Sequence, residues 1–124
     1  DDRRQGKFRA RLTERLLEYA KGQFELDKVQ EDGHALRHHA KIGDQRGGRR
    51  DPRLYSSCPP HFAYLWEWFL DLSWDRRRGE GAVQPLSSGD IAQWAALSGI
   101  HLRPREARML KLLDRLFLKV VCHG

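Results

Sequence analysis

The feature of the sequence that most limits its fold is an aromatic run at residues 64–74, YLWEWFLDLSW. Together with Phe62 this run holds six of the 12 aromatic residues of the chain. At 100° per residue its apolar side chains occupy much more of a helix surface than one stripe, and only Glu67 and Asp71 form a narrow charged strip. We therefore expect a helix that is covered on more than one side.

Two arrangements could provide that cover. Leu65, Phe69 and their neighbours fill about half of the helix, and Tyr64 and Trp68 extend the apolar arc beyond it. Either the N-terminal helix folds back over Tyr64 and Trp68, or these rings form a surface for another protein. Aromatic clusters occur both in cores and at interfaces, so the residues alone leave both arrangements open.

The rest of the chain predicts more helices and no strand. Pro59 and Pro60 suit the first turn of the aromatic helix, Gly99 ends a short helix at 90–98, and Pro104 begins a last helix that runs to about residue 121. Before them, an amphipathic helix at 7–29 carries Phe8, Leu12, Leu16, Tyr19, Ala20 and Phe24 on one side.

These patterns predict an all-α protein in three segments. Residues 1–29 form an N-terminal amphipathic helix, and residues 30–57 form a Gly- and Arg-rich polar linker in which the pattern allows a short helix at 34–42. Residues 58–124 form a compact domain, a bundle with three helices within 58–121. A chain of 124 residues has room for one such domain with an extension.

Composition narrows the class of protein. No run reaches the roughly 18 to 20 uncharged apolar residues of a membrane span, and the first ten residues lack the apolar core of a signal peptide. We therefore expect a cytoplasmic protein that contacts no membrane. Its two cysteines, Cys58 and Cys122, are expected to be reduced thiols.

The last helix separates apolar and basic residues. Its basic residues line one side at spacings of three, four and four: Arg108, Lys111, Arg115 and Lys119. The chain as a whole has a net charge of +6, so this ridge could contact the phosphates of a nucleic acid. A solvent-exposed helix face explains the same residues equally well.

A helix–turn–helix is the related alternative. Ala95 and Gly99 have the spacing of that motif. However, Arg105 stands where the second helix should bury an apolar residue, and Pro104 starts that helix too late. Nucleic acid is therefore the less favoured partner.

Neither a metal site nor catalysis is expected. Two sets of side chains could in principle bind zinc, but neither has a recognised ligand spacing: His34, His38 and His39, and Cys58, His61, Cys122 and His123. There is no nucleophile elbow and no phosphate-binding glycine loop. The sequence therefore predicts no cofactor and no enzymatic activity.

Residues 58–118 also carry a series of short motifs in a characteristic order. They are CPP at 58–60, LWEWF at 65–69, Leu72-Ser73, the arginines at 76–78, Pro85-Leu86, Asp90-Ile91, Trp94, Gly99, LRPRE at 102–106, Leu113-Asp114 and Phe117-Leu118. In this order and spacing the segment resembles the small tail assembly chaperones of long-tailed bacteriophages.

The resemblance implies a non-enzymatic protein of the bacterial host cytoplasm. Such proteins bind the helical tape measure protein and help tail tube subunits to polymerise around it. On this hypothesis Tyr64, Trp68 and Trp74 bind the partner by helix-in-groove packing. The core is expected to consist of Leu65, Trp66, Phe69, Trp94, Leu110, Leu113 and Phe117. A structural component of the tail, which would form homo-oligomers, is a further alternative.

Overall fold

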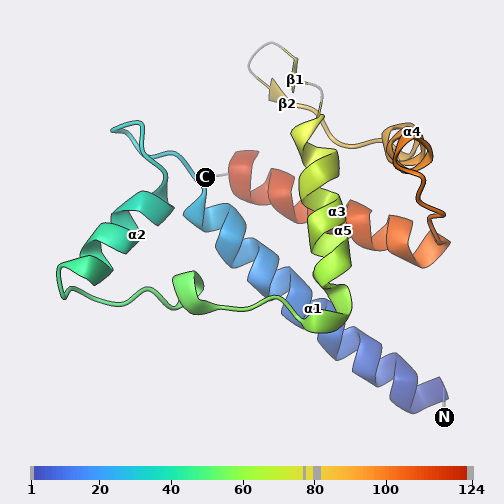
Figure 1. The fold of residues 1–124 in the computed structure, drawn as a ribbon, viewed down its shortest axis with the longest axis horizontal. Coiled ribbons are helices and arrows are strands. Elements are labelled where there is room, and N and C mark those ends of the chain that lie inside the picture. Colours follow the sequence, from blue (N-terminus) through green and yellow to red (C-terminus); the bar gives the residue numbers. More distant parts are fainter. Residues whose placement is uncertain (1, 77, 80–81, 123–124) are drawn as a thin grey trace.

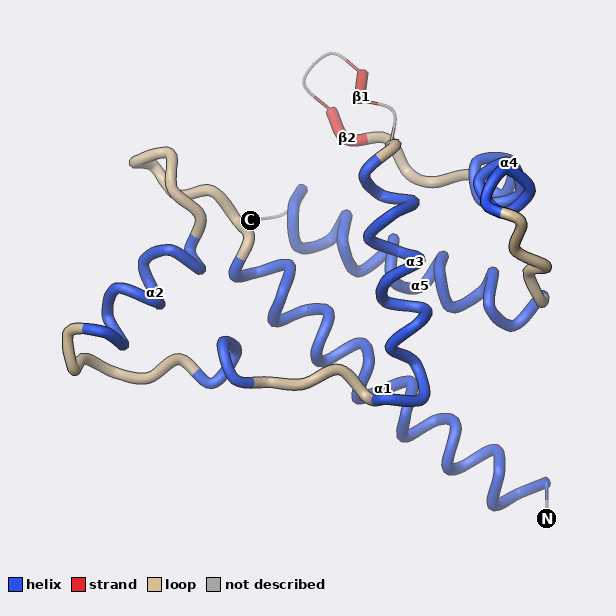
Figure 2. Tube along the Cα trace, viewed as in Figure 1, coloured by secondary structure: helices blue, strands red, loops and turns tan. Residues whose placement is uncertain are grey.

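The computed structural model describes residues 2–76, 78–79 and 82–122, and its fold is all-α, as predicted (Figures 1 and 2). The α-helices are α1 (Asp2–Leu26), α2 (Leu36–Gln45), α3 (Ala63–Trp74), α4 (Ser88–Ser98) and α5 (Pro104–Cys122). Pro59 and Pro60 do not lie in the first turn of the aromatic α-helix as predicted: Pro60 begins a short 3₁₀ helix, η2 (Pro60–Phe62), which leads into α3, and another 3₁₀ helix, η1 (Pro52–Tyr55), lies further upstream. The prediction of no strand is wrong at one place: between α3 and α4, β1 (Arg78–Gly79) and β2 (Ala82–Val83) form a short antiparallel ribbon with two residues in each strand.

The helix ends follow the capping residues in the sequence. The Ser87 hydroxyl accepts a hydrogen bond from the amide of Asp90 (3.0 Å), and the Asp90 carboxylate accepts one from the amide of Ser87 (2.9 Å). This reciprocal cap starts α4 at Ser88, two residues earlier than expected. Gly99 ends α4 in the left-handed region (φ 71°), where a side chain would be strained.

The core lies where α1, α3 and α5 meet. In Figure 1, α1 and α5 run in similar directions and α3 crosses them, while α4 lies at one end. The buried core residues are Leu16, Ala20 and Phe24 of α1, Leu65, Phe69 and Leu72 of α3, Leu86, Ile91 of α4, and Met109, Leu110 and Leu113 of α5. The N-terminal helix therefore contributes to the same core as the segment from residue 58 onward.

Most of the residues expected in the core are found there. Leu65, Phe69, Leu110 and Leu113 are buried. The aromatic rings of Trp66, Trp94 and Phe117 are half-buried and pack against this cluster. On α1 the predicted stripe is buried from Leu12 onward except for the half-buried Tyr19, whereas Phe8 is 55% exposed because it lies ahead of the bundle.

The polar segment at 30–57 is held against α1 by hydrogen bonds. The Gln23 amide donates to the carbonyl of Arg53 (3.2 Å), and its amide oxygen accepts from Arg37 (2.7 Å). A Cβ on Gly22 would lie 3.3 Å from Cγ of Arg53, so the glycine allows η1 to approach α1 closely. The predicted short helix in this segment is α2, shifted by two or three residues at each end.

A buried ion pair connects the end of α3 to α5. The guanidinium of Arg76 contacts the carboxylate of Asp114, and both side chains are nearly inaccessible to water. Arg76 also donates to the carbonyl of Gln84 (2.9 Å) and lies over the ring of Phe117. The second carboxylate oxygen of Asp114 accepts from the amide of Leu86 (2.9 Å). These bonds fix the segment that leads from the ribbon into α4.

Candidate functional site

Three sides of α3 are covered by three different parts of the fold. Leu65, Phe69 and Leu72 enter the core. The Trp66 ring lies against α1, with its centroid 5.3 Å from that of Tyr19 and 5.4 Å from that of Phe24. The N-terminal helix therefore covers Trp66, and not the Tyr64–Trp68 side that the sequence offered as an alternative.

The Tyr64–Trp68 side is partly covered by α4. The rings of Tyr64 and Trp68 meet edge to face at 4.9 Å, and Trp68 meets Trp94 at 6.0 Å. The indole N–H of Trp94 donates to the carboxylate of Asp71 (2.8 Å), which holds α4 against α3. Trp68 is thus half-buried and contributes to the fold, and Tyr64 remains 39% exposed.

The remaining side of α3 is open to solvent. We call it the α3 face and define it as Tyr64, Glu67, Leu70, Asp71 and Trp74, which span about 120° of the helix at 100° per residue. Trp74 is 91% exposed and Leu70 is 49% exposed. Exposed apolar residues grouped in this way on one helix are typical of a surface that receives another protein.

The structure does not unite the three predicted partner-binding residues in one cluster. Tyr64 and Trp68 are in contact, but Trp74 follows Trp68 by six residues, about 9 Å along the axis and about 120° around it. Its helical neighbour at i−4 is Leu70, whose apolar character alone does not reveal that it is exposed. The i, i+4 spacing to Trp74 was the signal that could have identified Leu70 as a surface residue.

The charges of the α3 face are all negative, although the chain as a whole has a net charge of +6. Glu67 and Asp71 are exposed, and α3 contains no basic residue. Partial burial raises the pKa of Tyr64, and the nearby Glu106 carboxylate raises it further. The phenol therefore stays neutral at physiological pH, and the charged residues of the α3 face itself are Glu67 and Asp71, with Arg103, Arg105 and Glu106 close to its Tyr64 end.

Comparison with known proteins identifies the group to which this fold and surface belong. A family model described as phage tail assembly chaperone matches residues 44–119, which include the whole of α3 and α4 and most of α5. The chain belongs to the phage tail assembly chaperone family. No curated protein and no solved structure matches it.

Membership confirms the resemblance seen in the motifs at 58–118 and extends it upstream to residue 44. The family name indicates a chaperone role in phage tail assembly, which implies interaction with other phage tail proteins. All of α1 and most of α2 lie outside the match, although α1 supplies part of the core. Within the part of the chaperone that the structure describes, no helix is long and apolar enough to cross a membrane.

The basic ridge of α5 is exposed in the chaperone. Arg108, Arg115 and Lys119 lie at the surface, and Lys111 is half-buried. No ion pair of these four residues is found among residues 2–76, 78–79 and 82–122. A role of this ridge in phosphate contact stays a prediction.

The structure describes all of the first set of candidate metal ligands, His34, His38 and His39, but only part of the second set. The rings of His34 and His38 stack at 4.5 Å, and His39 pairs with the carboxylate of Asp32 (2.9 Å). Across the described ranges, no three His, Cys, Asp or Glu side chains are grouped so that they could hold a metal ion. His123 of the second set lies outside those ranges, and Cys58 and Cys122 are free thiols.

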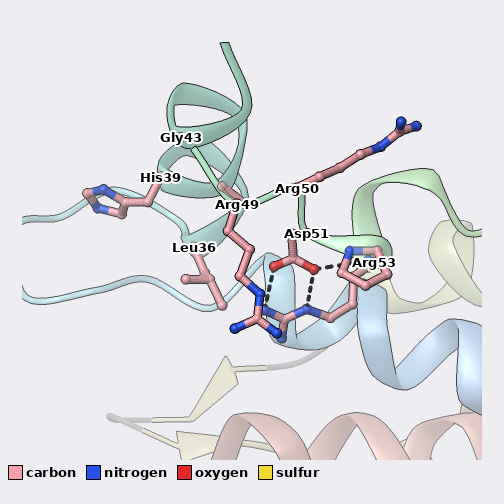
Figure 3. Close-up of a pocket in the computed structure, with 9 residues that line it drawn as sticks. Leu36, His39, Gly43, Arg49, Arg50, Asp51 and Arg53 are labelled. Carbon is pink, nitrogen blue, oxygen red and sulfur yellow. Dashed lines mark hydrogen bonds and ion pairs between the residues drawn. The ribbon is translucent and has the colours of Figure 1, made fainter. Parts of the chain in front are cut away.

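A pocket between α2 and η1 is lined by Arg49, Arg50 and Arg53, of which Arg53 is held by a carboxylate (Figure 3). Arg53 donates two hydrogen bonds to the carboxylate of Asp51 (3.0 and 2.7 Å), and these bonds hold the pKa of Asp51 below its usual range. Arg50 points away and lies over the ring of Tyr55. The pocket therefore reflects how residues 49–55 are anchored, and we assign no ligand to it.

Proposed function

We propose that this chaperone binds a helical segment of another tail protein, the tape measure protein or a tail tube subunit, through the α3 face during tail assembly. The observation that carries the proposal is the exposure of Trp74 (91%) beside Leu70 (49%) on one side of α3. Trp68 of α3 contributes by packing against Trp94 of α4 at the edge of that surface, and Tyr64 extends the surface.

The energetics of an exposed indole support this role. A tryptophan side chain can bury about 200 Å² in a contact, which corresponds to about 5 kcal/mol at about 25 cal/mol per Å². Only part of this appears as affinity, because association also restricts the motion of both partners. Tryptophan hot spots commonly lose about 2 kcal/mol or more on truncation to alanine, which is about 30-fold in the dissociation constant.

The test is a co-expression pull-down of the chaperone with each candidate tail protein, followed by titration of the pair. We expect Trp74→Ala to weaken capture by about 30-fold while thermal unfolding stays within about 0.5 kcal/mol of the wild type. Leu97→Ala is the matched control, because Leu97 is also 91% exposed but lies on α4, outside the α3 face. Equal capture by Trp74→Ala and the wild type would contradict the proposal.

Trp68→Ala is a less selective variant than the sequence implied. Trp68 packs against Trp94 and against the core, so its removal is expected to reduce both stability and capture. The nucleic-acid alternative is tested separately through the α5 ridge. It requires binding of DNA or RNA that weakens steeply with salt, with the log–log slope reduced by about one in Arg115→Ala.

A further inference from the structure

The first ten residues of α1 form an arm that extends beyond the bundle. In Figure 1 the N-terminal end of α1 projects past the beginning of α3, away from the other helices. Every described side chain from Arg3 to Arg11 is exposed, and the first buried residue of α1 is Leu12. We call residues 2–11 the N-terminal arm.

The arm has little intrinsic reason to be helical. Gly6 in its middle disfavours a helix by about 1 kcal/mol relative to alanine. Asp2 at the first position suits the helix macrodipole, but residues 3–11 contain five basic residues and no acidic one, so the arm as a whole carries concentrated positive charge near the helix N-terminus. A projecting segment of this length is only marginally stable in water. An acidic surface laid against the arm would relieve the unfavourable charge arrangement and exclude water from the helix.

One side of the arm combines positive charge with an aromatic ring. Arg4, Lys7, Phe8 and Arg11 lie within about 100° of the helix circumference. Phe8 is 55% exposed and touches only the edge of the His61 ring among described aromatic contacts. Arg4, Lys7 and Arg11 have no ion pair within residues 2–76, 78–79 and 82–122.

The α3 face is complementary to the arm both in charge and in exposed apolar surface. Glu67 and Asp71 are one turn apart, about 6 Å along the helix, as are Lys7 and Arg11. Leu70 and Trp74 lie beside the carboxylates and could bury the exposed ring of Phe8. Both surfaces are exposed in one copy of the chain, so the arm does not cover its own α3 face.

We propose that the N-terminal arm of one copy docks on the α3 face of a second copy. The contact joins two different surfaces, so it is heterologous and links copies head to tail, into a ring or an open chain. Because it uses the face assigned above to the tail protein, a tail protein would displace the arm. This competition rests on the proposed function, whereas the self-association does not.

The test uses the full chain alone, in sedimentation velocity over a range of concentrations, at about 25 mM and about 500 mM salt. We expect association at low salt that is lost at high salt, because the contact depends on partly exposed charges. Arg11→Glu and Glu67→Arg should each weaken it at least about tenfold, since each change places like charges opposite each other. Lys119→Glu, an exposed charge reversal at the far end of α5, is the control and should associate as the wild type does.

A mixing experiment distinguishes this contact from general charge effects. An equimolar mixture of Arg11→Glu and Glu67→Arg should associate again, because the second variant keeps the original arm and the first keeps the original α3 face, so the original contact can form between them. The double variant should likewise recover. A wild-type chain that stays monomeric at low salt, association that survives both single changes, or a mixture that stays monomeric would overturn the proposal. None of these results depends on a tail protein, so each is separable from failure of the proposed function.

Discussion

Replacing Asp114 with asparagine tests how strongly the buried ion pair holds the fold. Asparagine has nearly the same shape and can still accept the hydrogen bond from the Leu86 amide, but it leaves the Arg76 guanidinium buried without a counter-charge. Removing one partner of a buried ion pair costs about 3 to 5 kcal/mol. A chain of 124 residues has a total stability of about 6 to 19 kcal/mol, so the loss is a large share of it.

The assay is urea unfolding followed by tryptophan fluorescence and circular dichroism, with thermal unfolding alongside. We expect Tm to fall by about 10 to 20 °C for Asp114→Asn. Asp27→Asn is the control, because Asp27 pairs with Arg37 at 2.9 Å where both side chains reach solvent (64% and 29% exposed). A surface pair of this kind contributes at most about 1 kcal/mol.

Two results would refute this reasoning. The first is a loss for Asp114→Asn no larger than the loss for Asp27→Asn, which would mean that water reaches the guanidinium. The second concerns the double variant Arg76→Met with Asp114→Asn, which keeps an acceptor for the Leu86 amide. It removes both charges together and should recover most of the stability. If the double variant is less stable than Asp114→Asn, the hydrogen bonds of Arg76 to Ser73 and Gln84 matter more than its charge.

Further variants test other parts of the fold. Leu16→Ala should lower the free energy of unfolding by about 2 to 5 kcal/mol in urea titration, because Leu16 is fully buried between α1 and the rest of the core. A loss below about 1 kcal/mol would show that α1 is not integral to that core. Ser87→Ala should lower it by about 1 kcal/mol through loss of the α4 cap, whereas Ser88→Ala, one residue further on, should have little effect.

The sequence predicted the fold class and the positions of the helices because local signals determine them. Pro104 and Gly99 set helix ends through backbone geometry alone, and the apolar stripe of α1 follows from its 3.6-residue period. The motifs behind the family resemblance include Gly99 and Pro104 themselves, together with pairs such as Leu113-Asp114. These signals need no knowledge of which helix packs against which.

The division of the aromatic helix between core and surface could not be predicted in the same way. Trp66 and Trp74 are equally apolar in the sequence, yet Trp66 meets Tyr19 and Phe24 of α1, while Trp74 is almost fully exposed. The difference depends on the side from which α1 approaches, which is a long-range contact. For the same reason the sequence does not distinguish Arg76 from the two arginines that follow it, although Arg76 is buried in an ion pair with Asp114.

The packing of α1 against α5 also affects how the chain folds during its synthesis. Thr13 reaches Met109, and Phe24 stacks edge to face on Phe117, so partners in the core are more than 90 positions apart. Contacts between residues so far apart in the sequence form slowly, because the chain loses the entropy of closing a long loop before the contacts stabilise it. On the ribosome α3 emerges well before α5, and until then its indole and phenyl rings have no completed core to enter. The nascent chain is therefore expected to be prone to aggregation until α5 has been made.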